Sequence, residues 1–501
     1  MSGPSVHLEP PVTPIVPPAR RLWLWIAALL VATVLLIWAG SWWHARAASA
    51  QVRSLAVLPF ADLTHQNEPW FAGSFTGEII DCLARVPGLQ VTGRTSALRA
   101  KGDAAKKLGV TAVLEGTVSQ TGDRLHIALA MTRTSDGYHL WSAKFDRPAS
   151  DLRQAIEDAS TAIAHRLEVR MPALAPHRRQ PTPQAYAAYL QGRYLFDRAN
   201  PEALIHAQER LEEATDADPN FVPAWAWLSI VREYRVAAGM VRPNRLMPAS
   251  REAAERAVAL DPESGDAHLA LGIVKLQYDW DWPGAKEELD RAVQAMPESA
   301  FVLAWRARWF HSQGRMNEAV SETEHALALD PLSAAIASDA AAQYLSLNQP
   351  ERAVPFAQRA VDLNPDDAAA RAALANVLWL AGQREKSRQI VAELRRSGAS
   401  AKLPASVLAA LDARMGEPSV ARQLLDEAED LPDEELLPAV EYAGLAGALE
   451  DWDRLFSWTE EAYGERDVEL PYWRGNPLVP KSDPRFDAFL AQMNLPAPEA
   501  H

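Results

Sequence analysis

The 501-residue sequence has one cysteine, no long basic run and no familiar catalytic motif. Cys82 alone excludes an internal disulfide framework and a four-thiolate metal site. It lies in the apolar-patterned segment 78–86, which favours a buried structural thiol over a reactive one. Lys and Arg number 50 against 65 Asp and Glu, a net charge of −15. Nucleic-acid binding needs clustered cations, so no nucleic-acid partner is expected.

The motifs of common enzyme classes are also missing. The sequence has no G-x-G-x-x-G after a strand, no GxxxxGK[ST] loop, no H-E-x-x-H spacing and no G-x-S-x-G elbow. Its twelve histidines are scattered, and no carboxylate completes a triad with them. We therefore predict no catalytic residue, no cofactor and no metal site, and we expect a protein that is not an enzyme.

One long apolar run is present near the start of the chain. Residues 22–43 contain no Asp, Glu, Lys or Arg, and as a helix they would span roughly 33 Å, enough for a bilayer core. Tryptophans lie at both ends of the run, as in interfacial aromatic belts. We predict a disordered proline-rich stub at 1–19 and a transmembrane helix at 20–45 that contacts lipid through 22–43. Cleavage after the signal-peptidase-like Ala48-Ser49-Ala50 is the alternative.

A small α/β domain is expected at 53–170. Short apolar or alternating segments predict strands at 54–60, 89–95, 111–119, 124–132 and 138–146, and apolar residues at helical spacing predict helices at 70–86 and 150–170. Thr121-Gly122-Asp123 predicts a hairpin turn. Arg94-Thr95-Ser96 follows a strand, so it could contact an anion. Alternatively, Arg94 pairs with a surface carboxylate while Thr95 and Ser96 cap a turn.

The segments SLAVLPFADL (54–63), FTGEIIDCLARVPGLQVTGRTS (75–96) and 108–147 resemble the FlgO-like or TolB-amino-terminal-like domain. In bacterial signalling proteins that domain follows a membrane helix and is joined to nucleotide-cyclase domains or to CadC-type regulators. Since Arg20 and Arg21 before the span are balanced by Arg46 and Arg53 after it, the resemblance decides the expected orientation. It implies an inner-membrane protein with the region after the span in the periplasm. The stub is too short for an output domain, which is expected on another chain.

A repeat of about 34 residues is the clearest pattern in the sequence. After a linker at 171–182, we predict tetratricopeptide repeats at 183–400 and degenerate helical repeats with a carboxy-terminal cap at 401–496. Helix ends with similar sequences place prolines at 219, 262, 297, 331 and 365, and small residues follow ten positions later at 229, 272, 307, 341 and 375. An insertion at 239–248 lengthens the first interval and is expected to form a loop. The fold class is a membrane helix, then a small α/β domain, then an all-α solenoid.

YDWDWPGA (278–285) places two carboxylates near two tryptophans. A glycosidase would need such carboxyl groups across a sugar cleft, normally on different elements. The alternative is structural: Asp281 or Trp282 caps a helix, Pro283 lies in its first turn and the tryptophans pack between repeats. We favour the structural interpretation. The segment 472–496 resembles the closing segment of the same family.

The groove of such an array predicts the function. Groove positions 4, 7, 11 and 14 after each proline make Arg308, His311, Asn376 and Trp379 candidate partner contacts, and the alternative for each is an exposed residue without a partner. We expect a membrane-anchored protein that binds a protein or peptide partner at the cell envelope. The alternative is the sensor arm of a signalling system whose cyclase or DNA-binding output lies on another chain.

Overall fold

The computed structural model describes residues 52–63, 69–99, 108–169, 171, 180–198, 200–428, 430–431 and 436–496. The described residues from 53 onward belong to one compact unit. The predicted span 22–43 lies outside the described residues. Among those that are described, no helix is both long and apolar enough to cross a bilayer.

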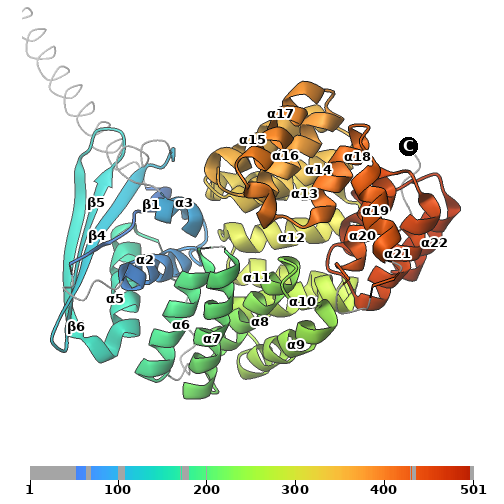
Figure 1. The fold of residues 1–501 in the computed structure, drawn as a ribbon. Helices are drawn as coiled ribbons and strands as arrows, with labels where there is room; N and C mark the ends of the chain where they lie inside the picture. The colour runs from blue at the N-terminus through green and yellow to red at the C-terminus, as the bar shows by residue number, and fades with distance from the viewer. Residues whose placement is uncertain are drawn as a thin grey trace, which may run out of the picture. The chain divides into compact units, whose positions relative to one another are not determined.

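The first part of the described chain is a small domain with a mixed sheet (Figure 1). Its elements are β1 (Ser54–Val57), β2 (Ala61–Asp62), α2 (Pro69–Leu83), β3 (Gln90–Val91), α3 (Arg94–Arg99), β4 (Ala112–Thr121), β5 (Arg124–Arg133), β6 (His139–Pro148), the short 3₁₀ helix η1 (Ala149–Asp151) and α5 (Leu152–Arg166). The strand order is β3-β1-β4-β5-β6, with β2 pairing β4. β1 runs parallel to β3 and β4, whereas β4, β5 and β6 are antiparallel.

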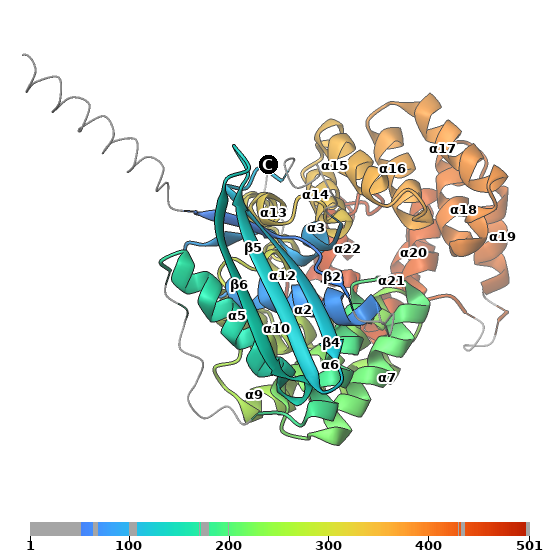
Figure 2. The same cartoon turned by 90° about the vertical axis from the view of Figure 1, so that its left-hand side faces the viewer.

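The hairpin predicted around 121–123 joins β4 to β5. Thr121 pairs with Arg124, and Gly122 in the two-residue loop has a φ of 63°, which suits glycine. Along β5, alternate residues from Leu125 to Met131 are buried, as expected for a strand with one covered face. α2 and α5 lie on that covered side of the sheet (Figure 2). The other face carries no described helix.

Two predicted strands are shorter in the structure. Segment 54–60 forms a strand only up to Val57, because Pro59 lacks the N–H that a ladder requires. The strand predicted at 89–95 is limited to Gln90–Val91, and α3 begins at Arg94. Asp330, far away in the chain, accepts a hydrogen bond from the Ser96 N–H at 2.7 Å and so caps this helix. That cap is a tertiary contact, which the local pattern does not contain.

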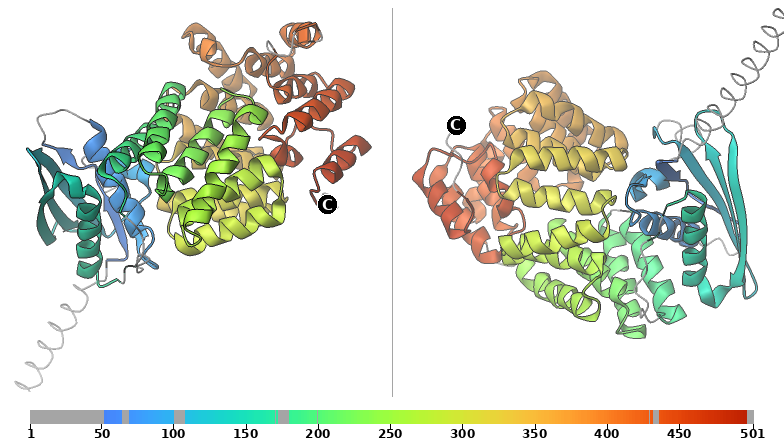
Figure 3. Two further views of the ribbon diagram at one scale, coloured as in Figure 1. Left: turned by 90° about the horizontal axis from the view of Figure 1, so that it is seen from below. Right: turned by 180° about the vertical axis from the view of Figure 1, so that it is seen from behind.

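The second part is helical throughout. Its helices are α6 (Pro183–Phe196), α7 (Pro201–Ala217), α8 (Val222–Ala237), α9 (Pro243–Leu260), α10 (Gly265–Val274) with the π-helical continuation η2 (Lys275–Asp279), α11 (Trp282–Ala295), α12 (Ala300–Ser312), α13 (Met316–Leu329), α14 (Ala334–Ser346), α15 (Pro350–Leu363), α16 (Ala368–Leu380), α17 (Arg384–Arg396), η3 (Ala399–Lys402), α18 (Ala405–Arg414), α19 (Ser419–Ala428), α20 (Ala439–Ala448), α21 (Trp452–Glu465), η4 (Leu470–Gly475) and α22 (Pro484–Gln492). From α6 to α21, each even-numbered helix packs against the odd-numbered helix that follows it (Figure 3).

The repeat motif determines where these first helices begin. Two residues after the prolines at 262, 297, 331 and 365, the side chains of Ser264, Ser299, Ser333 and Asp367 accept hydrogen bonds from N–H groups three residues on. Each is therefore the N-cap of its helix. Ten residues after the same prolines and Pro219, the small residues at 229, 272, 307, 341 and 375 are all buried. At Gly272 a Cβ would lie 2.9 Å from the Leu289 side chain, so only glycine permits this approach.

The prediction of a loop at 239–248 is wrong from Pro243 onward. α9 begins at Pro243, and Pro248 lies inside it. Proline suits the first turn of a helix, and Pro248 removes one intrahelical hydrogen bond while the neighbouring Met247 is fully buried. The insertion thus lengthens a second helix. The whole is a small mixed-sheet domain followed by an all-helical tetratricopeptide-like solenoid.

Candidate functional site

Polar side chains link consecutive first helices of the array, and we call the side that carries them the inner face. The residues that form these links are Glu233 on α8, Gln277 on η2, Arg308 and His311 on α12, Asp339 and Ser346 on α14, Asn376 on α16 and Arg414 on α18. The regular spacing of first helices places side chains 31 to 44 residues apart within hydrogen-bond distance. Extended inner surfaces of this kind are where solenoids bind their partners.

Arg308 lies in the middle of the inner face. Its Nε is 3.1 Å from Asp339 Oδ2 and its Nη2 is 3.0 Å from Asp339 Oδ1, a bidentate ion pair between α12 and α14. The guanidinium also lies 4.6 Å from the centre of the Trp305 ring. Arg308 is therefore engaged within the chain.

His311 lies one turn further along α12 and is buried. Its Nε2 is 2.9 Å from Ser346 Oγ, and its ring centre is 5.4 Å from that of Tyr472. Burial, together with the nearby Arg308 charge, lowers the pKa of His311 to about 4. This imidazole is therefore neutral at physiological pH and contributes hydrogen bonding but no charge.

Asn376 and Trp379 lie at the later repeats and are both half-buried. The Asn376 side-chain oxygen accepts a hydrogen bond from Arg414 of α18. Trp379 lies beneath two cations of α17, with the Arg384 and Arg388 guanidinium carbons 5.0 and 5.6 Å from its ring centre. The structure thus places the four sequence candidates in two groups, Arg308 with His311 and Asn376 with Trp379.

Arg414 was not among the sequence candidates. It is half-buried, and none of the described carboxylates forms an ion pair with it. Burial without a compensating charge lowers the pKa of this guanidinium. Its position 38 residues after Asn376, one repeat on, is the signal by which the sequence could have indicated it.

The inner face of the middle repeats is covered by the chain's own η4 segment. The Tyr472 hydroxyl donates to Gln277 Oε1 at 3.0 Å, and Arg474 Nη1 donates to the Gln313 carbonyl at 3.2 Å. Gly475 packs directly on α14, where a Cβ would lie 2.4 Å from the Ser346 Cβ. Residues almost 200 positions apart in the sequence therefore form one contact surface.

The tryptophans of segment 278–285 bind the same carboxy-terminal region. The Trp280 ring centre is 5.0 Å from that of Tyr463, and the Trp282 indole N–H donates to the Met493 carbonyl at 2.8 Å. Asp281 is the N-cap of α11, as the structural interpretation predicted. The tryptophans, however, pack against α21 and the end of α22 rather than only between adjacent repeats.

One carboxyl on the inner face is poorly satisfied. Glu233 is 1% exposed, its Oε1 accepts a hydrogen bond from Gln277 at 3.4 Å, and its Oε2 has no partner. Burial raises the pKa of Glu233 to about 7, although Arg308 and Gln277 oppose the shift. The carboxyl therefore exchanges a proton near neutral pH.

The sheet domain contacts the array through the segment 94–96, which the sequence offered as an anion site. Arg94 pairs with Asp81 and Asp197, each at 2.9 Å. The Ser96 hydroxyl accepts from the Leu332 N–H at 2.6 Å. A Cβ on Gly93 would lie 2.5 Å from the Asp330 side chain, so glycine permits the approach. Arg94 thus pairs with carboxylates, as the alternative interpretation expected, but at a partly buried junction between two parts of the chain rather than on the surface.

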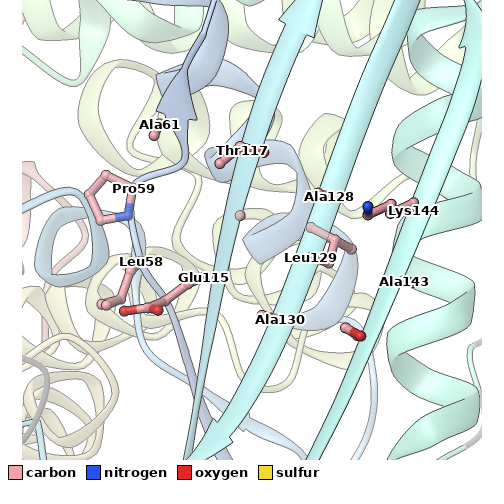
Figure 4. Close-up of a pocket in the computed structure, with 12 residues that line it drawn as sticks. Leu58, Pro59, Ala61, Glu115, Thr117, Ala128, Leu129, Ala130, Ala143 and Lys144 are labelled. Carbon is pink, nitrogen blue, oxygen red and sulfur yellow. The ribbon is translucent and has the colours of Figure 1, made fainter. Parts of the chain in front are cut away.

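The uncovered face of the sheet has a hollow of about 920 Å³ (Figure 4). Ala128 and Ala130 form its floor, with Glu115, Thr117 and Lys144 around them. The small side chains explain the hollow. No charged pair or buried polar group marks a particular ligand there.

Part of the array is similar to known repeat proteins. A family model described as tetratricopeptide repeat matches residues 344–411. The human IFIT1 dimer with PPP-AAAA is 16% identical, covering 62% of this chain and 78% of its own, with a TM-score of 0.39. PilF of Pseudomonas aeruginosa is 19% identical, covering 54% of this chain and 97% of its own, with a TM-score of 0.31. Residues 344–411, from α14 to α18, thus match the tetratricopeptide repeat family.

Part of the chain is also similar to a protein that is named as an enzyme. The protein named "Putative adenylate cyclase 3" of Rhizobium meliloti (strain 1021) is 31% identical over 189 residues, which are 36% of this chain. The matched part covers 32% of that protein, so the two share about a third of its length. The resemblance of 53–170 to the FlgO-like domain stays a prediction.

Proposed function

We propose that this tetratricopeptide repeat protein is anchored in the inner membrane through residues 22–43 and binds a protein or peptide partner on the inner face of its array. Repeats of this type present long surfaces that bind peptides rather than catalyse reactions. The observation that carries the proposal is the arginine at the later repeats. Arg414 is half-buried beside Asn376 and forms no ion pair with the described carboxylates. A half-buried cation without a counter-charge favours an anionic partner group.

The partner we propose therefore carries a carboxylate. Trp379 lies one turn from Asn376 on α16 and offers an aromatic surface near that carboxylate. Arginine, asparagine and tryptophan side chains together supply charge, a directional hydrogen bond and apolar area, the usual components of a binding hot spot.

Crosslinking of the membrane-bound protein followed by affinity capture and mass spectrometry tests this function. Arg414→Ala should reduce recovery of the specific partner at least fivefold. Arg396→Ala is the matched control, since it removes the same charge from an exposed position on the neighbouring helix α17. Equal loss in both variants, or no loss in either, would contradict a specific site at Arg414.

A second function is favoured by the 31% identity with the adenylate cyclase relative. In this version the protein is the sensor arm of a signalling system, and its partner is a cyclase or regulator chain. A cyclase among the captured proteins, together with a changed cyclic-nucleotide level when the protein is removed, would support this version. An unchanged level would exclude a cyclase as the output.

A further inference from the structure

The η4 segment contacts the array much as a bound peptide would. Its Tyr472 side chain reaches Gln277 of η2, its Arg474 reaches the end of α12, and its Gly475 lies against Ser346 of α14. Three successive repeats thus each contribute one contact. The aromatic contact between Tyr472 and His311 adds apolar area in the centre.

Two apolar residues of η4 are buried as well. Leu470 and Trp473 are buried, at 0% and 5% exposure, although they alternate with the residues that contact the array. Tyr472, Arg474 and Gly475 contact the inner face directly, and an added peptide can reproduce their polar contacts.

The ends of the segment are held separately. Before η4, the Glu465 carboxylate pairs with Arg242 at 2.7 Å, and Arg466 lies 4.5 Å from the centre of the Trp280 ring. After η4, Trp282 binds the Met493 carbonyl. The block that carries η4 can thus stay attached while η4 itself is exchanged.

The surface under η4 also contains a carboxyl, that of Glu233, with an unsatisfied oxygen. Gln277 donates to Glu233 and accepts from Tyr472, yet the second Glu233 oxygen has no partner. Burial of an unpaired polar atom opposes the closed arrangement. A partner segment that also donates to this oxygen would therefore have an advantage over η4.

We propose that η4 is an internal ligand of the inner face of η2, α12 and α14, and that this face accepts a partner segment of the form Tyr-x-Arg-Gly in its place. The proposal rests on the proposed function, because it names a second contact region for the same partner. The tyrosine hydroxyl binds Gln277, its ring lies on His311, the arginine binds the carboxyl end of α12, and the glycine fits against Ser346.

A labelled peptide with the sequence of residues 467–477, DVELPYWRGNP, is the probe. It is titrated against the full-length protein in detergent and against a variant with Tyr472→Ala and Arg474→Ala, which retains Leu470 and Trp473. We expect at least tenfold tighter binding to the variant than to the parent protein. The same peptide with alanine at its tyrosine and arginine should bind neither. Equal binding to both proteins, or no binding to a variant with unchanged circular dichroism, would overturn the proposal.

A variant that displaces η4 gives a second test that does not need the double variant. A Cβ on Gly475 would lie 2.4 Å from the Ser346 Cβ, so Gly475→Val should push η4 away from α14. This variant should bind the peptide and capture the partner at least fivefold better than the parent protein. Gly464→Val, where a Cβ meets open space, is the matched control and should change neither. If Gly475→Val leaves both unchanged, η4 is only a structural cap, while the site at Arg414 is unaffected. If capture fails in the parent protein and in both variants, the proposed function fails instead.

Discussion

The Arg94 Nε and an oxygen of Asp197 lie 2.9 Å apart, although 103 residues separate them in the sequence. Arg94 begins α3 of the sheet domain, and Asp197 is the C-cap of α6, the first helix of the array. Arg193 of α6 extends the contact, because its Nη2 donates to Asp81 of α2 at 3.0 Å and its guanidinium lies 3.4 Å from the Trp227 ring centre. The two parts of the chain are thus joined by a buried charge cluster.

Arg193→Ala should strongly destabilise this junction. Arg193 is 3% exposed, and its removal leaves the Asp81 and Glu78 carboxyls with less compensating charge in a buried place. Breaking one side of such a cluster costs about 3–5 kcal/mol. Chemical unfolding of the full-length protein measures the change. Arg210→Ala, which breaks an exposed pair with Glu213, should cost at most about 1 kcal/mol. A similar loss of unfolding free energy in both variants would show that the buried cluster stabilises the protein no more than an exposed ion pair does.

Glu233 should make stability depend on pH. Its pKa in the folded protein is about 7 against an ordinary 4.5, so the folded state binds more protons between these values. The free energy of unfolding should therefore fall as pH rises from about 4.5 to 7, by about 3 kcal/mol in all. Burial likewise raises the pKa of Asp467 to about 7, which adds a change of the same sign.

Glu233→Gln should remove the Glu233 contribution. The variant should unfold at a higher temperature than the parent protein at pH 8, and the difference should disappear near pH 4.5. Glu213→Gln, at an exposed position, should show no such pH-dependent gain. A difference in melting temperature that is the same at both pH values would contradict the assignment.

Trp379→Ala should weaken partner capture more than it weakens the fold. The ring is half-buried and lies near the Arg384 and Arg388 guanidinium groups. Each such cation–ring interaction contributes about 0.5–1 kcal/mol at an exposed site. We expect about 1 kcal/mol lower stability, but a loss of about 1–3 kcal/mol in partner affinity. Thermal unfolding and quantitative capture of one preparation give both values. Trp379→Phe should retain most of each, and unchanged capture in Trp379→Ala would remove this residue from the site.

The region after residue 53 should be accessible from the periplasm. Protease added to spheroplasts should degrade it, because the proposed orientation places the array outside the inner membrane. A cytoplasmic marker protein must remain intact in the same sample. Complete protection of the carboxy-terminal region would reverse the proposed topology.

The local sequence already contained the repeat. Prolines at intervals close to 34 residues and small residues ten positions later are short-range signals, and the small residues are buried as the repeat requires. The structure adds an N-cap two residues after four of these prolines, from residues that the sequence also contains. The hairpin at 121–123 and the N-cap Asp281 follow from local turn and capping chemistry in the same way. These features depend on neighbours within one or two helical turns, so the sequence alone determines them.

Which residues contact the inner face depended on the tertiary structure. His311 and Arg308 were identified as groove residues, but only the fold shows that Tyr472 and Asp339 already contact them. Nothing near Tyr472 in the sequence indicates Gln277 as its partner, because the two residues are 195 positions apart and meet only through the packing of the helices between them. In the same way, α3 begins at Arg94 because Asp330 caps it from another part of the chain. The sequence by itself determined the repeats, whereas the accumulated packing of many helices decided which surface of the repeats the chain itself covers.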